Sequence, residues 1–522
     1  MSEIRMVLQL LKNSKAPGED GITAELLKAG GKPVLEVLQK LFNSVLHGGI
    51  TPEAWSGSAV VLLFKKGDNA LLKNHRPISR LRSRVYVLFS RVITNRLARI
   101  LDDFQPPEQA GLQKRFSTID HIHTLRQIVQ KSEKYNLPLC LVYVDYEKAF
   151  DSVVRKKMWE LLPGYGVDGR LLRAVQSLYC DCKACVRVGH DLSPMFSVQT
   201  GVKQGCVMSS WLFILYLDSC LQKLKDSCLG VKLGDIKVNC LLYADDAVLI
   251  APSEAELQAL VTCMKEECEI KGLRLNANKT KVLVFERDEE RTKCEIWVNQ
   301  ECLEQVNEIV YLGSAFSRDG RCDLDVDRRV AAGNKVNGAL TALVKRQGVA
   351  KSARLAIHNA VLVPTLLYGS ETWVCQKKHK SKLNAVEMRS LRKMCGVTMA
   401  DRKRNEEIRN MAGLKDDLIT KIDKGVLRWF GHVERMSEDR MVKKIYSAKV
   451  NIKRCRGRPR LTFEDHVSKL LEEGRVKSTR IPRRACMKKI MNLKEAKEIC
   501  KDRDTWRSVL SGYPVRDVRE DK

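Results

Sequence analysis

Long apolar runs are missing from this 522-residue chain, and their absence argues against a membrane protein. No stretch reaches the roughly 18 uncharged apolar residues that a membrane-spanning helix needs. The first residues, Met1 to Leu11, include Glu3 and Arg5 and are typical of an amphipathic helix, so we expect no signal peptide and no secretion. The 18 cysteines are then expected to be reduced thiols of a nuclear or cytoplasmic protein.

Acidic residues are scarce relative to basic ones. The chain has 63 acidic and 92 basic residues, a net charge of +29 at pH 7. A surplus of this size favours a polyanionic partner, most often nucleic acid, over the alternative of a merely solvated basic surface. The surplus is dense in residues 441–460, which hold eight basic and no acidic residues.

Fixed-period repeats and long low-complexity linkers are also absent, and an apolar fraction of 44% with 30% charged residues is ordinary for a globular protein. The length of the chain predicts two to four domains. Short apolar runs between residues 140 and 315 predict strands that alternate with helices, whereas helical patterns dominate from about residue 325 onward. The predicted strands are 139–144, 240–243, 247–250, 281–285 and 308–312.

Two groups of carboxylates stand at the ends of these apolar runs. Asp145 follows the run 139–144, and the adjacent pair Asp245 and Asp246 interrupts the run 241–249. Buried unpaired charge is unfavourable, so such residues need a compensating cation, and Mg²⁺ prefers carboxylate and phosphate oxygens. A pair of such ions can activate a 3′-hydroxyl and stabilise a leaving pyrophosphate. The alternative for the pair alone is a plain hairpin turn with exposed acids.

Tyr243–Asp246 resembles the signature hairpin of reverse transcriptases, and Asp145–Asp151 is similar to the first metal-binding motif of the non-LTR (LINE-type, RTE-like) retrotransposon enzymes. Further segments match that family in order: 12–22, 74–79, 200–206, 272–280 and 311–314. Beyond them, Pro364–Trp373 resembles the thumb of RTE-type elements, and 428–433 and 456–460 are similar to its C-terminal region. The N-terminal endonuclease of complete elements is not found in the chain.

The resemblance implies an α+β, right-hand polymerase fold with a basic helical C-terminal region. Fingers and palm would occupy residues 1–325, the thumb 326–412, and a basic nucleic-acid-binding region 413–522. The implied activity is RNA-directed DNA polymerisation with two Mg²⁺ ions, or Mn²⁺, held by Asp145, Asp245 and Asp246. Lys279 matches a lysine that could protonate pyrophosphate as a general acid; an exposed surface lysine is the alternative.

The resemblance also implies residues that bind the substrates. Lys65 and Arg76 would clamp the incoming triphosphate, unless they are only surface charge. Phe150 would crowd a 2′-hydroxyl and so favour dNTPs, with a core aromatic as the alternative. Gln204 and Gly205 would contact the template–primer near the new base pair, although Gly205 also suits a helix entry. Tyr311, Leu312 and Gly313 would hold the primer end.

The C-terminal region contains two further candidates for nucleic-acid contacts. Arg456, Arg458 and the neighbouring Arg460 form an Arg-Gly-Arg-Pro-Arg segment that could enter the minor groove of A·T-rich DNA, with a generic phosphate-binding loop as the alternative. Trp429 and Phe430 could stack on an unpaired base, but a place in a helical core is favoured. The cysteines of 180–185 are weighed as zinc ligands, but their spacing and the strand-like run 184–188 favour no structural metal.

The expected partners are an RNA template, a DNA primer or target, dNTPs, and a separate endonuclease if the element is to move. No membrane partner is expected, and the oligomeric state is left open. The protein would act in the nucleus or cytoplasm as a ribonucleoprotein. Two alternatives remain. One is a catalytically inactive remnant that binds nucleic acid, and the other is an RNA-directed RNA polymerase, which Phe150 disfavours.

Overall fold

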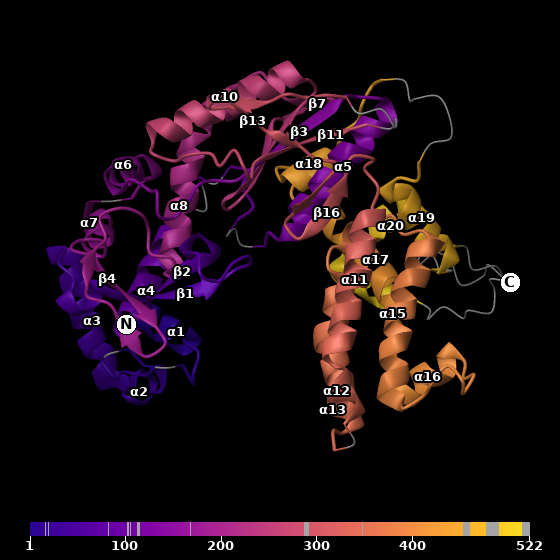
Figure 1. Ribbon diagram of the computed structural model, residues 1–522, viewed down its shortest axis with the longest axis horizontal. Coiled ribbons are helices and arrows are strands. Elements are labelled where there is room, and N and C mark those ends of the chain that lie inside the picture. Colours follow the sequence, from indigo (N-terminus) through magenta and orange to yellow (C-terminus); the bar gives the residue numbers. More distant parts are fainter. Residues whose placement is uncertain are drawn as a thin grey trace.

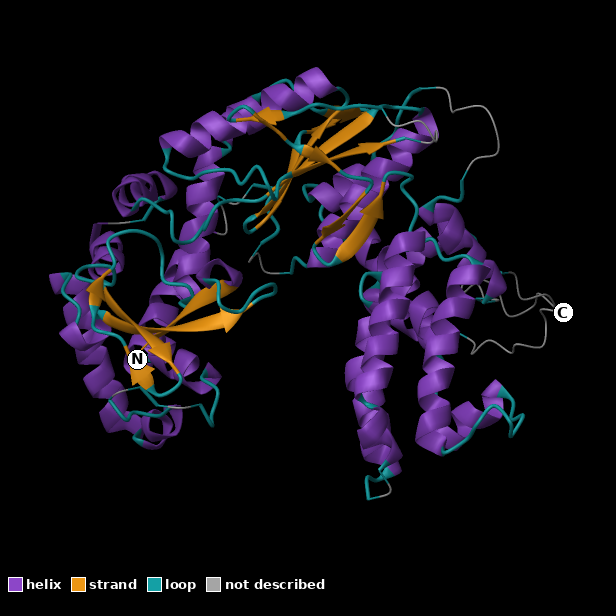
Figure 2. Cartoon of the chain, in the orientation of Figure 1, coloured by secondary structure: helices purple, strands orange, loops and turns teal. Residues whose placement is uncertain are grey.

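The structure is a computed structural model, and it describes all residues except 16, 19, 82, 102–103, 105, 112–114, 168, 287–291, 347, 453–459, 475, 477–489 and 514–522. Its elements form an arch (Figures 1 and 2). N-terminal helices and a small sheet lie at one end, a larger sheet lies at the top, and long helices form the other end. None of the described helices is long and apolar enough to cross a membrane.

The N-terminal end of the arch packs helices against a five-stranded sheet. In this sheet β1 (Gly57–Phe64) pairs antiparallel with β2 (His75–Leu81) and parallel with β4 (Lys183–Val188). The short strands β5 (Asp191–Leu192) and β6 (Phe196–Ser197) pair with β4. The helices of this part are α1 (Ser2–Leu10), α2 (Ala24–Ala29), α3 (Gly31–Gly48), α4 (Arg84–Leu101), α6 (Arg155–Leu161) and α7 (Gly169–Ser177).

The central sheet has the strand order β14-β11-β3-β10-β9. Its strands are β3 (Leu139–Val144), β9 (Cys240–Tyr243), β10 (Asp246–Ala251), β11 (Lys281–Phe285) and β14 (Glu304–Gln305). On one face it packs against α8 (Val207–Cys220) and α10 (Glu254–Ile270), and on the other against α5 (Thr118–Tyr135). Because both faces are buried, the strands are continuously apolar, which is why their sequences predict them so clearly.

As predicted, helices dominate the rest of the chain. A hairpin of β15 (Glu308–Tyr311) and β16 (Ser314–Ser317) leads into them. The helices that follow are α11 (Asp323–Ala339), α12 (Thr341–Lys345), α13 (Lys351–Ile357), α14 (Val363–Leu367), α15 (Lys377–Cys395), α16 (Asn405–Ala412), α17 (Leu418–Glu434), α18 (Met441–Ser447), α19 (Phe463–Glu473), α20 (Leu493–Ile499) and α21 (Arg503–Ser511). Trp429 and Phe430 lie in the core of the last five of these helices, as the favoured interpretation of their sequence expected. The mixture of helices and sheets confirms the α+β class.

The C-terminal helices are attached to the central sheet through α5. Helix α18 lies against α5 (Figure 1). Arg440 Nη2 pairs with Asp120 Oδ1 at 2.7 Å, and Lys131 Nζ donates to the carbonyl oxygens of Tyr446 at 3.0 Å and Ala448 at 2.5 Å. The side chains of Arg440 and Asp120 are largely buried, so this contact is part of the folded core and not a loose surface pair.

Buried histidines of α5 make the stability of the protein depend on pH. His123 is enclosed by the rings of Trp429, Tyr446 and Phe463, with centroid distances of 5.6, 6.3 and 4.8 Å. Burial lowers the pKa of His123 to about 3, and it does the same for His121 on the same helix. Both imidazoles are therefore neutral in the folded protein.

We expect the protein to lose stability as the pH falls below about 6.5, the pKa of an unfolded histidine. Since the folded pKa lies below the unfolded value, the unfolded chain binds a proton that the folded chain does not. Stability is then complete above pH 6.5 and is lost towards lower pH, by about 1 kcal/mol for each buried histidine at pH 5.5. Thermal unfolding at pH 7.5 and 5.5 measures this loss. The loss of stability between pH 7.5 and 5.5 should be smaller in His123→Leu than in the wild type. An equal loss in the two proteins would contradict the prediction.

Candidate active site

The hairpin between β9 and β10 carries two of the three predicted carboxylates. Tyr243 pairs with Asp246, so Ala244 and Asp245 form a two-residue turn between the strands. Ala244 adopts a left-handed backbone conformation with φ of 56°, which only glycine adopts without strain. The next pair, Ala247 with Val144 of β3, places Asp145 beside Asp246 at the same end of the sheet. The structure thus brings Asp145 together with the adjacent pair Asp245 and Asp246, which begins 100 residues later in the chain.

The three carboxylates repel one another. Partial burial, followed by the negative charges of Asp245 and Asp145, raises the pKa of Asp246 to about 6. The only cation paired with the cluster among the described residues is Lys279, whose Nζ lies 3.1 Å from Asp145 Oδ2. Lys279 was predicted from the sequence and indeed lies at the site, with an exposed side chain.

The donor set fits divalent cations. Carboxylate oxygens are the ligands that Mg²⁺ prefers, and the mutual repulsion at Asp246 is what a bound cation would relieve. In the described part of the chain no three acidic, histidine or cysteine side chains already stand in position around one ion. The carboxylates would therefore turn towards an ion, and Asp145 would share its charge between that ion and Lys279.

The loop that follows α10 forms hydrogen bonds with the backbone of Asp145. The backbone oxygen of Asp145 accepts from Asn276 N at 2.8 Å, and its backbone nitrogen donates to Thr280 Oγ1 at 3.3 Å. Glu147 N donates to Arg274 O at 2.9 Å. The loop that bears Lys279 is thus hydrogen-bonded along the segment that bears Asp145, which fixes the lysine close to the carboxylates.

The fingers candidates Lys65 and Arg76 lie at the end of the β1–β2 hairpin. Arg76 pairs with Leu63 across the two strands, and Lys65 N donates to Asn74 O at 2.9 Å. Both side chains are exposed, so they are free to contact an anion. Neither forms an ion pair with the carboxylates in the described structure, and their binding of a triphosphate stays a prediction.

Phe150 contacts α8, and Gln204 and Gly205 lie close to β2 of the N-terminal sheet. The half-buried ring of Phe150 stacks on Phe213 of α8 at 4.6 Å with an angle of 19° between the planes. Gln204 Nε2 donates to Asp151 Oδ1 at 3.3 Å, and Gln204 O accepts from Ser79 N of β2 at 2.8 Å.

Gly205 stands just before α8, at the helix entry that was weighed as its alternative role. Its φ is +115°, and a Cβ atom there would lie 2.7 Å from the backbone oxygen of Ser79. Only glycine therefore permits this close approach between the helix entry and β2.

The turn that was predicted to hold a primer end joins β15 to β16. Tyr311 pairs with Ser314, and both central residues have positive φ, 47° at Leu312 and 81° at Gly313. Such a turn suits a tight hairpin. The hydroxyl of Tyr368 donates to Leu312 O at 2.8 Å and lies 2.9 Å from Thr118 Oγ1 of α5. The sequence singled out the segment around Tyr368 but not this contact, which depends on residues far away in the chain.

Asp325, at the start of α11, is a buried junction that sequence reasoning missed. Its carboxylate accepts from Arg126 Nη2 of α5 at 2.9 Å, from Ala315 N of β16 at 2.9 Å and from Trp373 Nε1 at 2.8 Å. Arg329 approaches it to 3.9 Å. One carboxylate thus connects helix α5, the β15–β16 hairpin and the helices that follow.

Of the three arginines of the segment 456–460, only Arg460 falls within the described residues. Its guanidinium donates to Asp319 O at 2.7 Å and pairs with Glu133 of α5. Arg456 and Arg458 lie outside the described residues. The described cysteines are free thiols, and Cys182 and Cys185 of the weighed zinc set are buried.

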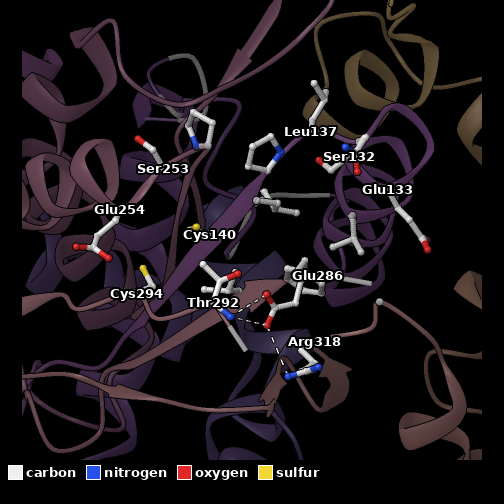
Figure 3. Close-up of a pocket in the computed structure, with 18 of the residues that line it drawn as sticks. Ser132, Glu133, Leu137, Cys140, Ser253, Glu254, Glu286, Thr292, Cys294 and Arg318 are labelled. Atoms are coloured by element: carbon white, nitrogen blue, oxygen red, sulfur yellow. Dashed lines mark hydrogen bonds and ion pairs between the residues drawn. The ribbon is translucent and has the colours of Figure 1, made fainter. Parts of the chain in front are cut away.

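A separate cavity of about 440 Å³ lies at the other end of β3 (Figure 3). Glu286 in its wall accepts from Thr292 N at 3.0 Å and lies 3.6 Å from Arg318 Nη1. The thiol of Cys294, together with burial, raises the pKa of Cys140 in the same wall. This cavity contains none of the predicted catalytic residues, so the carboxylate end of the sheet remains the candidate active site.

Comparison with known proteins agrees with this geometry. Residues 64–316 match the family described as "Reverse transcriptase (RNA-dependent DNA polymerase)". Relatives include the "Transposon TX1 uncharacterized 149 kDa protein" of Xenopus laevis, 26% identical over 54% of this chain and 22% of that protein. The Pol polyprotein of the type-2 retrotransposable element R2DM of Drosophila melanogaster is 26% identical over 73% of this chain and 34% of its own length.

The polymerase of the mobile element jockey, also of Drosophila melanogaster, is 23% identical over 78% of this chain and 45% of its own length. The chain thus spans less than half of each of these relatives. Among solved structures, a telomerase from Candida tropicalis in complex with a fragment of telomeric RNA has a TM-score of 0.39 at 11% identity, covering 80% of this chain and 68% of that one. Residues 64–316 therefore match a reverse transcriptase domain, and the chain is similar to proteins of transposons and retrotransposable elements, two of which are a Pol polyprotein and an RNA-directed DNA polymerase.

Proposed function

We propose that this protein is an RNA-directed DNA polymerase that adds deoxynucleotides to a primer 3′-hydroxyl. The observation that carries the proposal is the convergence of Asp145, Asp245 and Asp246 at one end of the central sheet. Bound there, two Mg²⁺ or Mn²⁺ ions would supply the Lewis-acid chemistry of nucleotidyl transfer. The three carboxylates would hold and orient the ions, and the raised pKa of Asp246 supports a need for positive charge at this place.

The neighbouring side chains have roles in the same proposal. Lys279 would hold a proton near Asp145 for the leaving pyrophosphate, since its ammonium group already lies 3.1 Å from that carboxylate. Lys65 and Arg76 would bind the triphosphate with exposed positive charge. Gln204 and Gly205 would face the new base pair, and the Tyr311–Gly313 turn would hold the primer end. In phosphoryl transfer such positioning and charge neutralisation provide most of the rate enhancement.

The proposed partners are an RNA template and a DNA primer or target. The net charge of +29 supports a polyanionic partner, and Arg460 together with Arg456 and Arg458 would add phosphate contacts. We further propose that residues 1–325 act as fingers and palm, 326–412 as thumb and 413–522 as a nucleic-acid-binding region. The protein would work as a ribonucleoprotein in the nucleus or cytoplasm, with a separate endonuclease as a further partner.

Primer extension by the purified full chain on an RNA template tests the function. We expect Mg²⁺-dependent incorporation of dNTPs, and far less of rNTPs. Absence of product at every Mg²⁺ and Mn²⁺ concentration, with salt-sensitive RNA binding retained, would favour the inactive nucleic-acid-binding remnant instead. Preferential use of rNTPs would indicate an RNA-directed RNA polymerase.

Replacing Phe150 by valine is expected to weaken the selection against ribonucleotides. The ring is fixed by its stacking on Phe213, so its removal should open space where a 2′-hydroxyl would otherwise be crowded. We expect rNTP incorporation to rise by about tenfold or more relative to dNTP incorporation. Competition between the two nucleotides on one template measures the ratio. Phe104→Val, which alters an exposed ring, is the control, and an unchanged ratio in Phe150→Val would assign that ring to the core alone.

A further inference from the structure

A short segment, residues 108–111, runs beside the outer strand of the central sheet. Leu242 N of β9 donates to Glu108 O at 2.9 Å, and Ala110 N donates back to Leu242 O at 3.0 Å. The two segments form an isolated parallel bridge at Gln109 and Leu242. Strand β9 is the last in the sheet order, so these bonds occupy the edge that leads directly into the Ala244–Asp245 turn.

The side chain of Gln109 reaches that turn. It is 1% exposed, and its Oε1 accepts from Ala244 N at 3.0 Å and from Gly111 N at 2.8 Å. A carbonyl oxygen has two lone pairs, and both partners here are N–H donors, so the orientation of the amide is determined by its surroundings. Ala244 is the strained, left-handed residue of the turn, and this bond holds its backbone in place directly before Asp245.

Gly111 lies against the same residue. A Cβ atom at Gly111 would stand 2.5 Å from Ala244 N and 3.1 Å from Ala244 Cα, both backbone atoms that cannot swing aside. Any larger side chain would therefore push the turn away from the segment. Glycine at 111 and glutamine at 109 together provide close contact and a hydrogen-bond acceptor at one point of the catalytic turn.

We propose that Gln109 and Gly111 are positioning residues that fix the Ala244–Asp245 turn and thereby the direction in which the Asp245 carboxylate points. In this role they would act through the turn backbone, which both of them contact at Ala244, and not by binding substrate or metal themselves. The inference rests on the proposed polymerase function, because it assigns the turn a metal-holding carboxylate. Its effect should appear in the affinity for divalent metal, since groups that orient a metal ligand typically change that affinity by about tenfold or more.

The test uses the full chain with Gln109→Met, which keeps length and bulk but loses the acceptor, and Gly111→Ala. Gln39→Met and Gly48→Ala on α3 are the matched controls, since Gly48 has open space around it. Mn²⁺ binding, followed by electron paramagnetic resonance with Asp245→Ala as the reference for binding at the turn, is measured beside primer extension. We expect about tenfold weaker Asp245-dependent Mn²⁺ binding and a matching rise in the Mg²⁺ concentration for half-maximal rate, with RNA affinity and Tm near wild type.

Two results would overturn the inference. One is Asp245-dependent Mn²⁺ binding that equals the wild type in both variants. The other is a loss of Tm and activity with an unchanged metal requirement, which would make the role merely structural. Mn²⁺ binding is measured without turnover, so it tests the positioning role independently of polymerase activity. A wild-type chain that binds Mn²⁺ but extends no primer would refute the proposed function, and the Mn²⁺ affinities of the two variants would still test the positioning role.

Discussion

Asp245→Asn is expected to lower primer extension by about a thousandfold or more, equivalent to roughly 4 kcal/mol of lost transition-state stabilisation. The amide keeps the size of the carboxylate but removes the charge that would hold a cation. The repulsion that raises the pKa of Asp246 would also decrease, because Asp245 contributes to it. RNA affinity should stay near the wild-type value, since a single neutralised carboxylate does not weaken binding to a polyanion.

The loss of activity is measured as the rate of single-nucleotide incorporation by a complex of the protein with template and primer that is formed before the nucleotide is added. Asp235→Asn is the matched control, because Asp235 is exposed in the tight turn between the short strands β7 (Val231–Leu233) and β8 (Ile236–Val238) and lies outside the carboxylate cluster. An Asp245→Asn protein that retained a tenth of the wild-type rate would show that the hairpin is not the metal-holding turn. Equal loss in both variants would point to a general effect of surface charge.

Asp325→Asn is expected to weaken the junction between the central sheet and the long helices. Removing the charge leaves the guanidinium of Arg126, whose side chain is 10% exposed, without its anionic partner in a buried place. Breaking such a pair typically costs about 3 to 5 kcal/mol. The bonds from Ala315 N and Trp373 Nε1 would also lose their charged acceptor. We therefore expect a lower urea midpoint and shorter products for each binding event.

The control for this change lies on the same helix. Asp327 pairs with Lys382 at 2.5 Å, but both side chains are about half exposed, so Asp327→Asn should change stability by less than about 1 kcal/mol. Urea unfolding and single-encounter primer extension compare the two variants. If both lose equally little stability, the buried carboxylate is not a junction; if product length is unchanged while stability falls, the junction does not affect the hold on nucleic acid.

A part of the molecule could be predicted well where the interactions that form it leave a pattern in nearby residues of the sequence. The strands 139–144, 240–243 and 281–285 match the observed β3, β9 and β11, because burial on both faces produces uninterrupted apolar runs. Strand β1 is only half-buried and has its parallel partner, β4, more than a hundred residues later, so no local pattern marks that pairing.

The site shows the same division. Asp145, Asp245 and Asp246 could be found because a charge at the end of a buried strand is costly and therefore conspicuous. Gln109, Tyr368 and Asp325 could not, because each matters through bonds to backbone groups that are 10 to 135 residues away. A glutamine or a tyrosine in an ordinary loop sequence gives no sign of which distant amide or carbonyl it will meet.

One side of helix α5 is covered by residues that lie far along the chain. In this 18-residue helix, Asp120 pairs with Arg440, and Lys131 donates to the carbonyl oxygens of Tyr446 and Ala448. These partners lie more than 300 positions further along the chain. Until those residues have been synthesised, they cannot bury the side of α5 that bears His123. More than 300 residues after α5 must therefore be synthesised while part of this helix is still exposed to solvent.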